Sequence, residues 1–208
     1  MSTMAADPPA APRRMRAPER REAILAAARR EFALHGFHGA GTAAIAREAG
    51  CSEAILYRHF ASKKALLTAV LRAEVARRVE GGDAIVPPPG AAPVSLADVL
   101  ASHLADGDLG VTARLVLLAI SMSGDPEMGE AVREGFNAVR GPVRTALAAG
   151  QAAGVLRDDI DAESLTWMWH GLFLVALVRN TLAEDGVALG AVGAARELER
   201  VLAPPAGG

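Results

Sequence analysis

The chain has 208 residues, of which 51% are hydrophobic and 22% charged, with a mean hydropathy of +0.21. This length and composition exclude general disorder and allow one large or two small domains with a buried core. The net charge of −2 is unevenly divided: residues 1–64 hold 11 Lys and Arg against 6 Asp and Glu, whereas residues 65–208 hold 11 against 18. A basic N-terminal third on an acidic body predicts that one end of the protein meets a polyanion.

The first helix is predicted to run from Pro18, which suits a first helical turn, to Gly36. Before it, residues 1–17 are rich in alanine and proline, and we expect them to be disordered in isolation. They are either an inert tail or a basic arm that contacts DNA phosphates or the minor groove. The helix repeats apolar residues at four-residue steps, namely Ile24, Ala28 and Phe32.

Residues 42–60 are interpreted as two short helices around a tight turn. Gly50 supplies the turn, because glycine adopts the left-handed conformation at little cost. Ser52 caps the second helix. Two short helices around a glycine turn, the second carrying ring and cationic groups, are typical of a helix-turn-helix. The residues expected to anchor the second helix are Ile55, Leu56 and Phe60.

A longer helix is predicted from the capping residue Ser62 to about Gly81. Prolines exclude a helix from residues 83–94, and Ser95 then caps a helix to about Asp106. The buried stripe of the longer helix is expected to be Ala65, Leu66, Ala69, Val70, Ala73 and Ala76.

Four more helices are expected in the last half of the chain. Residues 111–122 are almost continuously apolar, and a helix that begins at Asp125-Pro126 should reach Ala153, with a kink or break at Gly141-Pro142. Asp161 caps a helix over residues 162–182, and the last covers residues 189–202. No stretch alternates as a strand does, so the expected fold class is all-α with about nine helices.

The sequence indicates neither a secreted nor a membrane protein. A single cysteine, Cys51, fits a reducing compartment, and its expected role is that of a buried small hydrophobe rather than a redox sensor. The first twenty residues lack the apolar run of a signal peptide. The longest uncharged apolar run, residues 164–178, is shorter than the about 20 residues of a membrane span. We therefore expect a cytoplasmic protein.

No pattern of catalytic residues is apparent: there is no Ser/His/Asp arrangement, no Cys/His cluster and no phosphate-binding glycine loop. His35 and His38 lie three residues apart, but no carboxylate follows at a suitable spacing. We therefore expect neither an enzyme nor a protein that holds a metal or cofactor.

A series of residues at fixed spacing carries a family resemblance. It comprises the sequence Phe-Ala-Leu-His-Gly-Phe at residues 32–37, followed by Ile45, Ala46, Ala49, Gly50, Ser52, Leu56, Tyr57, His59, Phe60, Ser62, Lys63, Lys64, Ala65 and Leu66. With these, residues 18–71 resemble the N-terminal DNA-binding domain of the TetR family of bacterial transcriptional regulators. The resemblance implies a homodimer that binds a roughly palindromic double-stranded DNA operator, represses in most cases, and is released by a small ligand.

The implied domains are a helix-turn-helix domain at residues 18–64 and a ligand-binding and dimerisation domain at residues 65–208. The resemblance places Tyr57, His59 and Lys63 against the DNA backbone. Where the family usually has a Gly-Thr pair, this chain has Ala54 and Ile55, and Ile55 could touch a thymine methyl group. The full set expected to bind DNA is Thr42, Ser52, Glu53, Ala54, Ile55, Tyr57, Arg58, His59 and Lys63.

Both tryptophans, Trp167 and Trp169, and Phe173 lie within two helical turns. They are either residues of the core and the dimer interface or the wall of an apolar pocket that binds a small hydrophobic effector. The expected ligand-binding set is His103, Met122, Phe136, Trp167, His170 and Phe173.

Family members dimerise through their last two long helices, and the surface expected to do so here is Leu172, Val175, Ala176, Arg179, Ala191, Ala194, Ala195 and Leu198. An alternative function is that of a helical dimer that acts mainly through protein partners. Its DNA-binding head would be weakened by the departures at residues 40, 41, 54 and 55.

Overall fold

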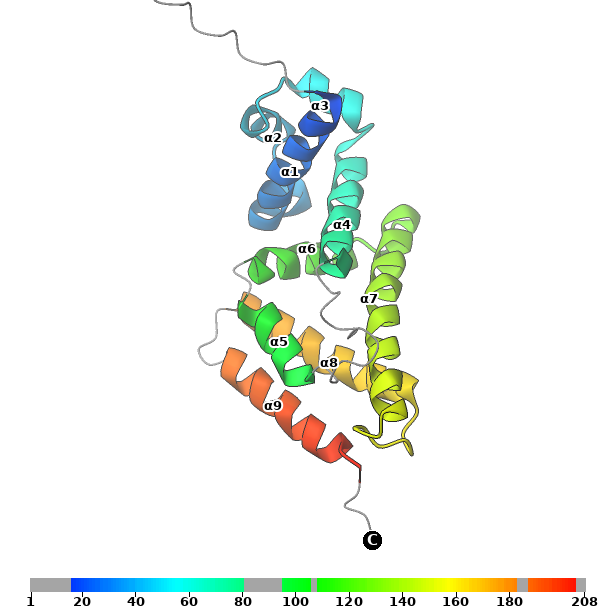
Figure 1. The fold of residues 1–208 in the computed structure, drawn as a ribbon. Coiled ribbons are helices and arrows are strands. Elements are labelled where there is room, and N and C mark those ends of the chain that lie inside the picture. Colours follow the sequence, from blue (N-terminus) through cyan, green and yellow to red (C-terminus); the bar gives the residue numbers. More distant parts are fainter. Residues whose placement is uncertain (1–15, 81–94, 106–107, 183–186, 205–208) are drawn as a thin grey trace, which may run out of the picture.

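The computed structural model describes residues 16–80, 95–105, 108–182 and 187–204, and every regular element within these ranges is a helix. The predicted all-α class is therefore confirmed (Figure 1). The helices are α1 (Ala17–Gly39), α2 (Thr42–Glu48), α3 (Glu53–His59), α4 (Lys63–Glu80), α5 (Leu96–Ala105), α6 (Leu109–Ser121), α7 (Pro126–Ala152), α8 (Ala162–Thr181) and α9 (Val187–Leu202).

The predicted capping residues determine where several helices begin. Ser52, Ser62, Ser95 and Asp161 each accept a hydrogen bond from a backbone N–H of the following turn, over 2.9–3.4 Å. Asp125 accepts two such bonds at 3.1 Å. These oxygens satisfy N–H groups that have no partner inside the helix, so the local sequence sets the start of each helix.

Two predicted interruptions turn out differently. The first helix was expected to end at Gly36, where φ is 66° and the helix is kinked, but helical structure resumes and continues to Gly39. A kink or break was predicted at Gly141-Pro142, and the break is wrong, because α7 is one helix with Pro142 inside it. Proline removes a single backbone donor, and the remaining hydrogen bonds of a 27-residue helix suffice to carry it past that point.

The largest core cluster joins the N-terminal helices to the body. Phe32 of α1 and Leu56 of α3 are almost completely buried and belong to one cluster with Leu115 of α6 and Met128 of α7. Helix α4 runs from the head, formed by α1–α3, toward α6 and α7 (Figure 1). The cluster thus crosses the boundary predicted at residues 64 and 65, so the head and the body share one core.

The buried stripe of α4 differs from the predicted one. Ala73 and Ala76 are exposed, whereas Glu74 is only 3% exposed. The larger leucines orient the helix, because they bury more apolar area than alanines do. The buried residues of α4 are Leu66, Leu67, Thr68, Val70, Leu71 and Glu74.

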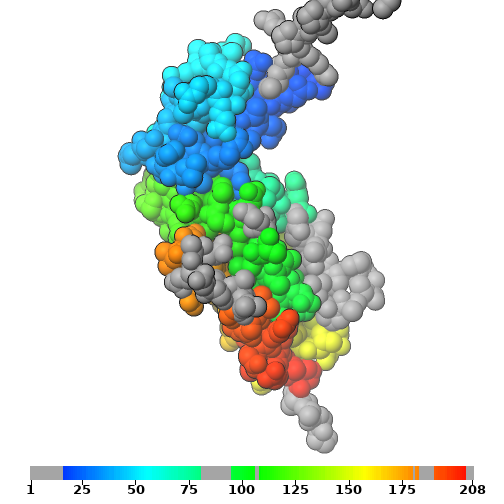
Figure 2. Space-filling view, turned by 90° about the vertical axis from the view of Figure 1, so that its left-hand side faces the viewer, coloured from blue at the N-terminus to red at the C-terminus, as the bar shows by residue number. Residues whose placement is uncertain are grey.

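A second core cluster joins α5, α7, α8 and α9 at the far end of the molecule. Ala176 and Ala195, expected at a dimer interface, are buried inside it at 3% and 0% exposure, so that expectation is wrong for both. The outer surface carries other apolar residues, namely Met168, Val175, Leu182 and Val201. The space-filling view shows the head at one end and α9 at the other (Figure 2).

Within the described ranges, no helix is long and apolar enough to cross a membrane. The expectations for residues 1–15 and 83–94 fall outside those ranges.

Candidate DNA-binding surface and effector cavity

The helix-turn-helix is held rigidly from inside. Gly50 has a φ of 66°, as predicted for the turn, and Ile45 of α2 and Leu56 of α3 are fully buried against the first core cluster. Phe60 is 5% exposed and ends α3. Buried anchors on one side of α3 leave its opposite side facing outward.

The nine residues predicted to bind DNA lie on or beside that outward side. Ser52, Glu53, Ala54, Tyr57 and Arg58 are exposed, whereas Thr42, Ile55, His59 and Lys63 are partly buried. The hydroxyl of Ser52 already caps α3, so its contribution to DNA binding would be to position the helix. DNA contact by the other eight stays a prediction.

Three of these side chains form a polar cluster between α2 and α3. The Thr42 hydroxyl donates to a carboxylate oxygen of Glu53, and the Tyr57 hydroxyl donates to Thr42 Oγ1 over 3.4 Å. The Thr42 hydroxyl is therefore engaged by a carboxylate whose own charge repels phosphates, and the Tyr57 hydroxyl is engaged by Thr42. Glu53 is expected to oppose DNA binding rather than to support it.

Replacing Glu53 with glutamine should raise the affinity for mixed-sequence duplex DNA by about twofold to fivefold, as expected for an exposed charge interaction worth up to about 1 kcal/mol. Fluorescence anisotropy at low salt measures this. Glu48→Gln is a matched control, because Glu48 is an exposed head carboxylate that pairs with Arg30 at 2.5 Å. An equal gain in the control would indicate a general charge effect, and a loss of affinity in Glu53→Gln would indicate that Glu53 contacts a base.

The two adjacent lysines at the start of α4 have different surroundings. Lys63 Nζ lies 3.5 Å from the carbonyl oxygen of His38 and 5.2 Å from the ring centroid of Phe37, and no carboxylate pairs with it among the described residues. Lys64 pairs with Asp125 at 2.9 Å and with Glu127 at 3.5 Å. The hydrogen bond that Lys64 donates to Asp125, aided by Glu127, raises the pKa of Lys64. Lys63 is thus the lysine available to a phosphate.

Sequence reasoning missed Arg47, which lies in the last turn of α2 and lines a shallow hollow with Glu53 and Ile55. The signal available in the sequence was a positive charge three residues before the turn glycine, Gly50. Cys51 lines the same hollow and packs against the first core cluster. Burial raises the pKa of its thiol despite the opposing charge of Arg20, which favours a structural role.

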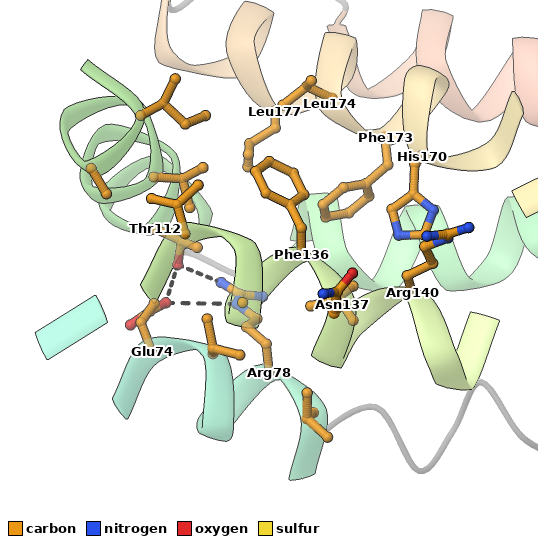
Figure 3. A pocket seen from close by; sticks show the side chains of 18 of the residues that line it. Glu74, Arg78, Thr112, Phe136, Asn137, Arg140, His170, Phe173, Leu174 and Leu177 are labelled. Atoms are coloured by element: carbon orange, nitrogen blue, oxygen red, sulfur yellow. Dashed lines mark hydrogen bonds and ion pairs between the residues drawn. The ribbon is translucent and has the colours of Figure 1, made fainter. Parts of the chain in front are cut away.

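The body contains a cavity of about 380 Å³ lined by residues from α4 to α8 (Figure 3). Its size is typical of ligand sites. Of the six residues predicted to bind an effector, five line it: His103, Phe136, Trp167, His170 and Phe173. Met122 does not, because it forms the C-cap of α6 and packs against the first core cluster under the head.

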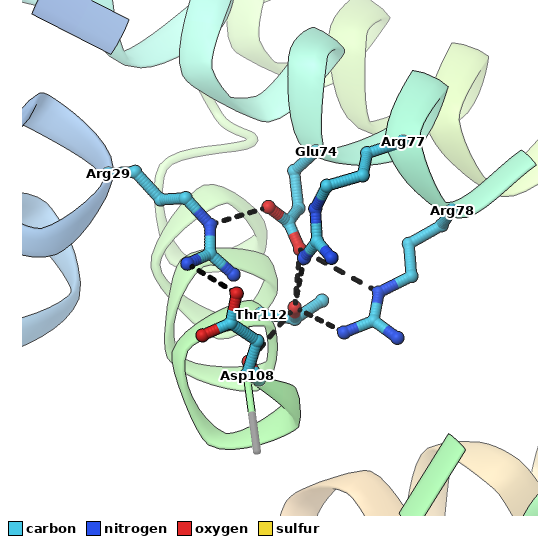
Figure 4. Close-up of polar contacts among 6 residues, drawn as sticks. All are labelled: Arg29, Glu74, Arg77, Arg78, Asp108 and Thr112. Carbon is cyan, nitrogen blue, oxygen red and sulfur yellow. Dashed lines mark hydrogen bonds and ion pairs between the residues drawn. The ribbon is translucent and has the colours of Figure 1, made fainter. Parts of the chain in front are cut away.

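One polar region of the cavity wall is built around Glu74. Arg29 Nε donates to Glu74 Oε2 over 2.8 Å, Arg77 donates to Oε1 over 2.6 Å, and the Thr112 hydroxyl also donates to Oε1 (Figure 4). Burial alone would raise the pKa of Glu74. The hydrogen bonds from Arg29 and Thr112 and the nearby guanidinium charges outweigh it and hold that pKa below its ordinary value.

This polar cluster connects three helices. Arg29 lies on α1 of the head, Glu74 on α4, and Asp108 at the start of α6 pairs with Arg29 at 3.2 Å. Arg78 donates to Thr112 over 2.8 Å, and Glu74, Arg78 and Thr112 all line the cavity. The sequence pattern did not reveal this cluster, because its members lie far apart in the chain and the predicted buried stripe of α4 did not include Glu74.

The other polar region lies around α7 and α8. Arg140 pairs with Glu163, and its guanidinium carbon is 5.7 Å from the ring centroid of Trp167, which is 67% exposed. Within the cavity wall, His170 Nδ1 lies 2.8 Å from the carbonyl oxygen of Thr166. The second ring nitrogen of His170 is buried with no hydrogen-bond partner among the described residues. It is a polar group that a ligand could satisfy.

Comparison with known proteins gives a family for the N-terminal domain. The family model described as "Bacterial regulatory proteins, tetR family" matches residues 24–70. The HTH-type transcriptional activator FasR of Mycolicibacterium smegmatis is 46% identical over 63 residues, which are 30% of this chain and 29% of that protein. The HTH-type transcriptional repressor AcnR of Corynebacterium diphtheriae is 39% identical over 61 residues, 29% and 32% of the two chains.

Each match thus spans less than a third of the curated relative. The similarity in fold covers more of the chain than the similarity in sequence does. A protein described as a transcriptional regulator from Saccharomonospora viridis, solved in complex with choline, has a TM-score of 0.73 at 23% identity. The similarity covers 90% of this chain and 99% of that one. The sequence match therefore assigns residues 24–70 to the tetR family of bacterial regulatory proteins, and the whole chain is similar to the S. viridis protein in fold.

Proposed function

We propose that this protein is a transcriptional repressor that binds a palindromic operator as a homodimer and leaves it when a small hydrophobic effector binds in the body. The observation that carries the proposal is the exposed cationic surface around α3. Arg47 and Arg58 are exposed and have no ion-pair partner among the described residues, and Lys63 is the first residue of α4. Cations arranged around an exposed recognition helix suit the phosphates on either side of a major groove.

A second chain would bring two such surfaces onto one face of the DNA. The recognition helices of a two-fold dimer must lie about 34–36 Å apart to reach successive major grooves. We propose that the outer surface of α8 and α9 forms the dimer interface. Exposed apolar groups support this, since Met168 and Val175 lie seven residues apart on α8 and Val201 lies near the end of α9.

The effector part of the proposal rests on the apolar cavity, with Phe136 and Phe173 in its wall. The choline complex of the S. viridis protein supports a small molecule as the effector in this fold. The two curated relatives differ in how they act, since one is described as an activator and the other as a repressor. Transcription from a promoter that contains the operator, measured with and without the protein, shows whether the protein represses or activates it.

Replacing Lys63 with alanine should weaken DNA binding by about tenfold across sequences and lower the slope of log affinity against log salt by about 1, because one phosphate contact is lost. Lys64→Ala is the matched control, since Asp125 and Glu127 already pair with that charge. Anisotropy titrations over a range of salt concentrations measure both. Equal slopes for Lys63→Ala and the unaltered protein would remove Lys63 from the DNA interface.

A further inference from the structure

The charged groups in the cavity wall suggest what kind of effector it accepts. Among the described residues that line the cavity, Arg78 and Arg140 carry guanidinium groups, and Glu74 carries a carboxylate. That carboxylate is already engaged by three donors, from Arg29, Arg77 and Thr112. The wall therefore offers hydrogen-bond donors and positive charge to a ligand. A carboxylate that faces such donors in a low-dielectric site makes strong charge-assisted hydrogen bonds.

Arg78 is better placed than Arg140 to hold an anionic headgroup. Its side chain is 16% exposed, compared with 40% for Arg140, so its charge is screened less by solvent. Arg140 also pairs with Glu163 and lies over the exposed ring of Trp167. In Figure 3, Arg78 lies with Thr112 on one side of Phe136, and Arg140 lies with His170 on the other.

We propose that the effector is an amphipathic carboxylate, whose headgroup binds Arg78 and Thr112 while its apolar part lies along Phe136 and Phe173. The inference rests on the proposed function. It specifies which class of ligand the cavity binds and how binding in the cavity affects the head. It follows from the position of Arg78 and Thr112, which contact both the cavity and the carboxylate of Glu74.

The same contacts provide a route from the cavity to the head. A ligand carboxylate that accepts hydrogen bonds from Arg78 and Thr112 takes both groups from Glu74 Oε1 (Figure 4). Glu74 then retains Arg29 on Oε2 and Arg77 on Oε1. Arg29 of α1 also pairs with Asp108, at the start of α6, and Thr112 lies on the same helix. A movement of Thr112 toward the ligand therefore changes how α1, α4 and α6 contact one another. Arg29 is thus the positioning residue that couples the effector to the head.

The headgroup preference can be measured on the unaltered full-length protein by titration calorimetry with dodecanoate, 1-dodecanol and dodecylamine, which share one chain length. Dodecanoate should bind at least about tenfold more tightly than the alcohol, as expected for a charge-assisted hydrogen bond, and the amine should bind most weakly. Equal affinities, a preference for the amine, or no binding of dodecanoate would each overturn the inference.

Three variants locate the headgroup. Arg78→Gln should remove the preference for dodecanoate over the alcohol, whereas Arg77→Gln should keep it within about twofold, because Arg77 contacts Glu74 without lining the cavity. Arg140→Gln should also keep it. Loss of the preference in Arg140→Gln alone would place the headgroup near Trp167 and overturn the assignment to Arg78. Should Arg78→Gln fail to fold, the headgroup series on the unaltered protein still decides the ligand class.

The coupling has its own test. Arg29→Gln should bind dodecanoate like the unaltered protein, but dodecanoate should no longer change its affinity for DNA. A dodecanoate effect on DNA binding that is the same in this variant would overturn the coupling role of Arg29. These outcomes differ from a failure of the proposed function, in which the unaltered protein would bind no DNA even at low salt without any ligand.

Discussion

Replacing Glu74 with glutamine should lower the free energy of unfolding by about 3–5 kcal/mol, the loss expected when one partner of a buried ion pair is removed. The carboxylate is 3% exposed, and Arg29 and Arg78 beside it are 18% and 16% exposed. A glutamine keeps the shape but not the charge, so both guanidinium groups lose the anion of Glu74, and Arg29 keeps its pair with the half-exposed Asp108. Chemical denaturation followed by circular dichroism measures the loss.

The effect should depend on pH with a definite sign. The folded state holds the pKa of Glu74 below its ordinary value, so the unfolded chain binds the proton more readily. The stabilisation is therefore present at neutral pH and is lost as the pH falls through the lowered pKa. The difference between the unaltered protein and Glu74→Gln should shrink below about pH 4.

Glu134→Gln serves as the control for Glu74. Glu134 also links two helices, pairing with Arg72 at 3.1 Å, but both side chains are about half exposed. Its replacement should cost at most about 1 kcal/mol, as for other surface pairs. A similar small loss in Glu74→Gln would mean that the Glu74 cluster does not hold α1 against α4.

The second large effect is expected from Phe32→Ala, which should lower the free energy of unfolding by about 3–5 kcal/mol. Phe32 is 1% exposed and stacks against Phe37, with ring centroids 6.3 Å apart. Leu34→Ala on the same helix is the control, because Leu34 is 70% exposed and its loss should change little.

Phe32→Ala also tests whether head and body unfold together. The cluster around Phe32 includes Leu115 of α6 and Met128 of α7, so loss of packing in the head weakens the body as well. Calorimetry should show one transition that moves to lower temperature as a whole. A separate early transition of the head, with the rest unmoved, would contradict a shared core.

Local signals in the sequence predicted much of this fold. The caps at Ser52, Ser62 and Asp161 and the turn at Gly50 depend on residues next to each other in the chain, and the structure contains all four. The recognition helix could be oriented for the same reason, since Leu56 and Phe60 mark its inner side.

Features that depend on packing between distant helices could not be read from the sequence. Ala73 was expected in the buried stripe of α4, but it is exposed and Glu74 beside it is buried, because Arg29, 45 residues away, brings a countercharge to Glu74. Met122 was expected in the cavity, but the end of α6 lies under the head. Ala195 has the small side chain of an interface residue, yet it packs inside its own chain.

The most direct test of the proposed function is selection of bound sequences from a random pool of duplex DNA, followed by titration of the selected duplex over a range of salt concentrations. A dimeric repressor should enrich two inverted half-sites with centres about 10–10.5 base pairs apart, bind two chains per site, and lose affinity steeply as salt rises. Failure to enrich any sequence, with no complex on any duplex at about 50 mM salt, would contradict the proposal.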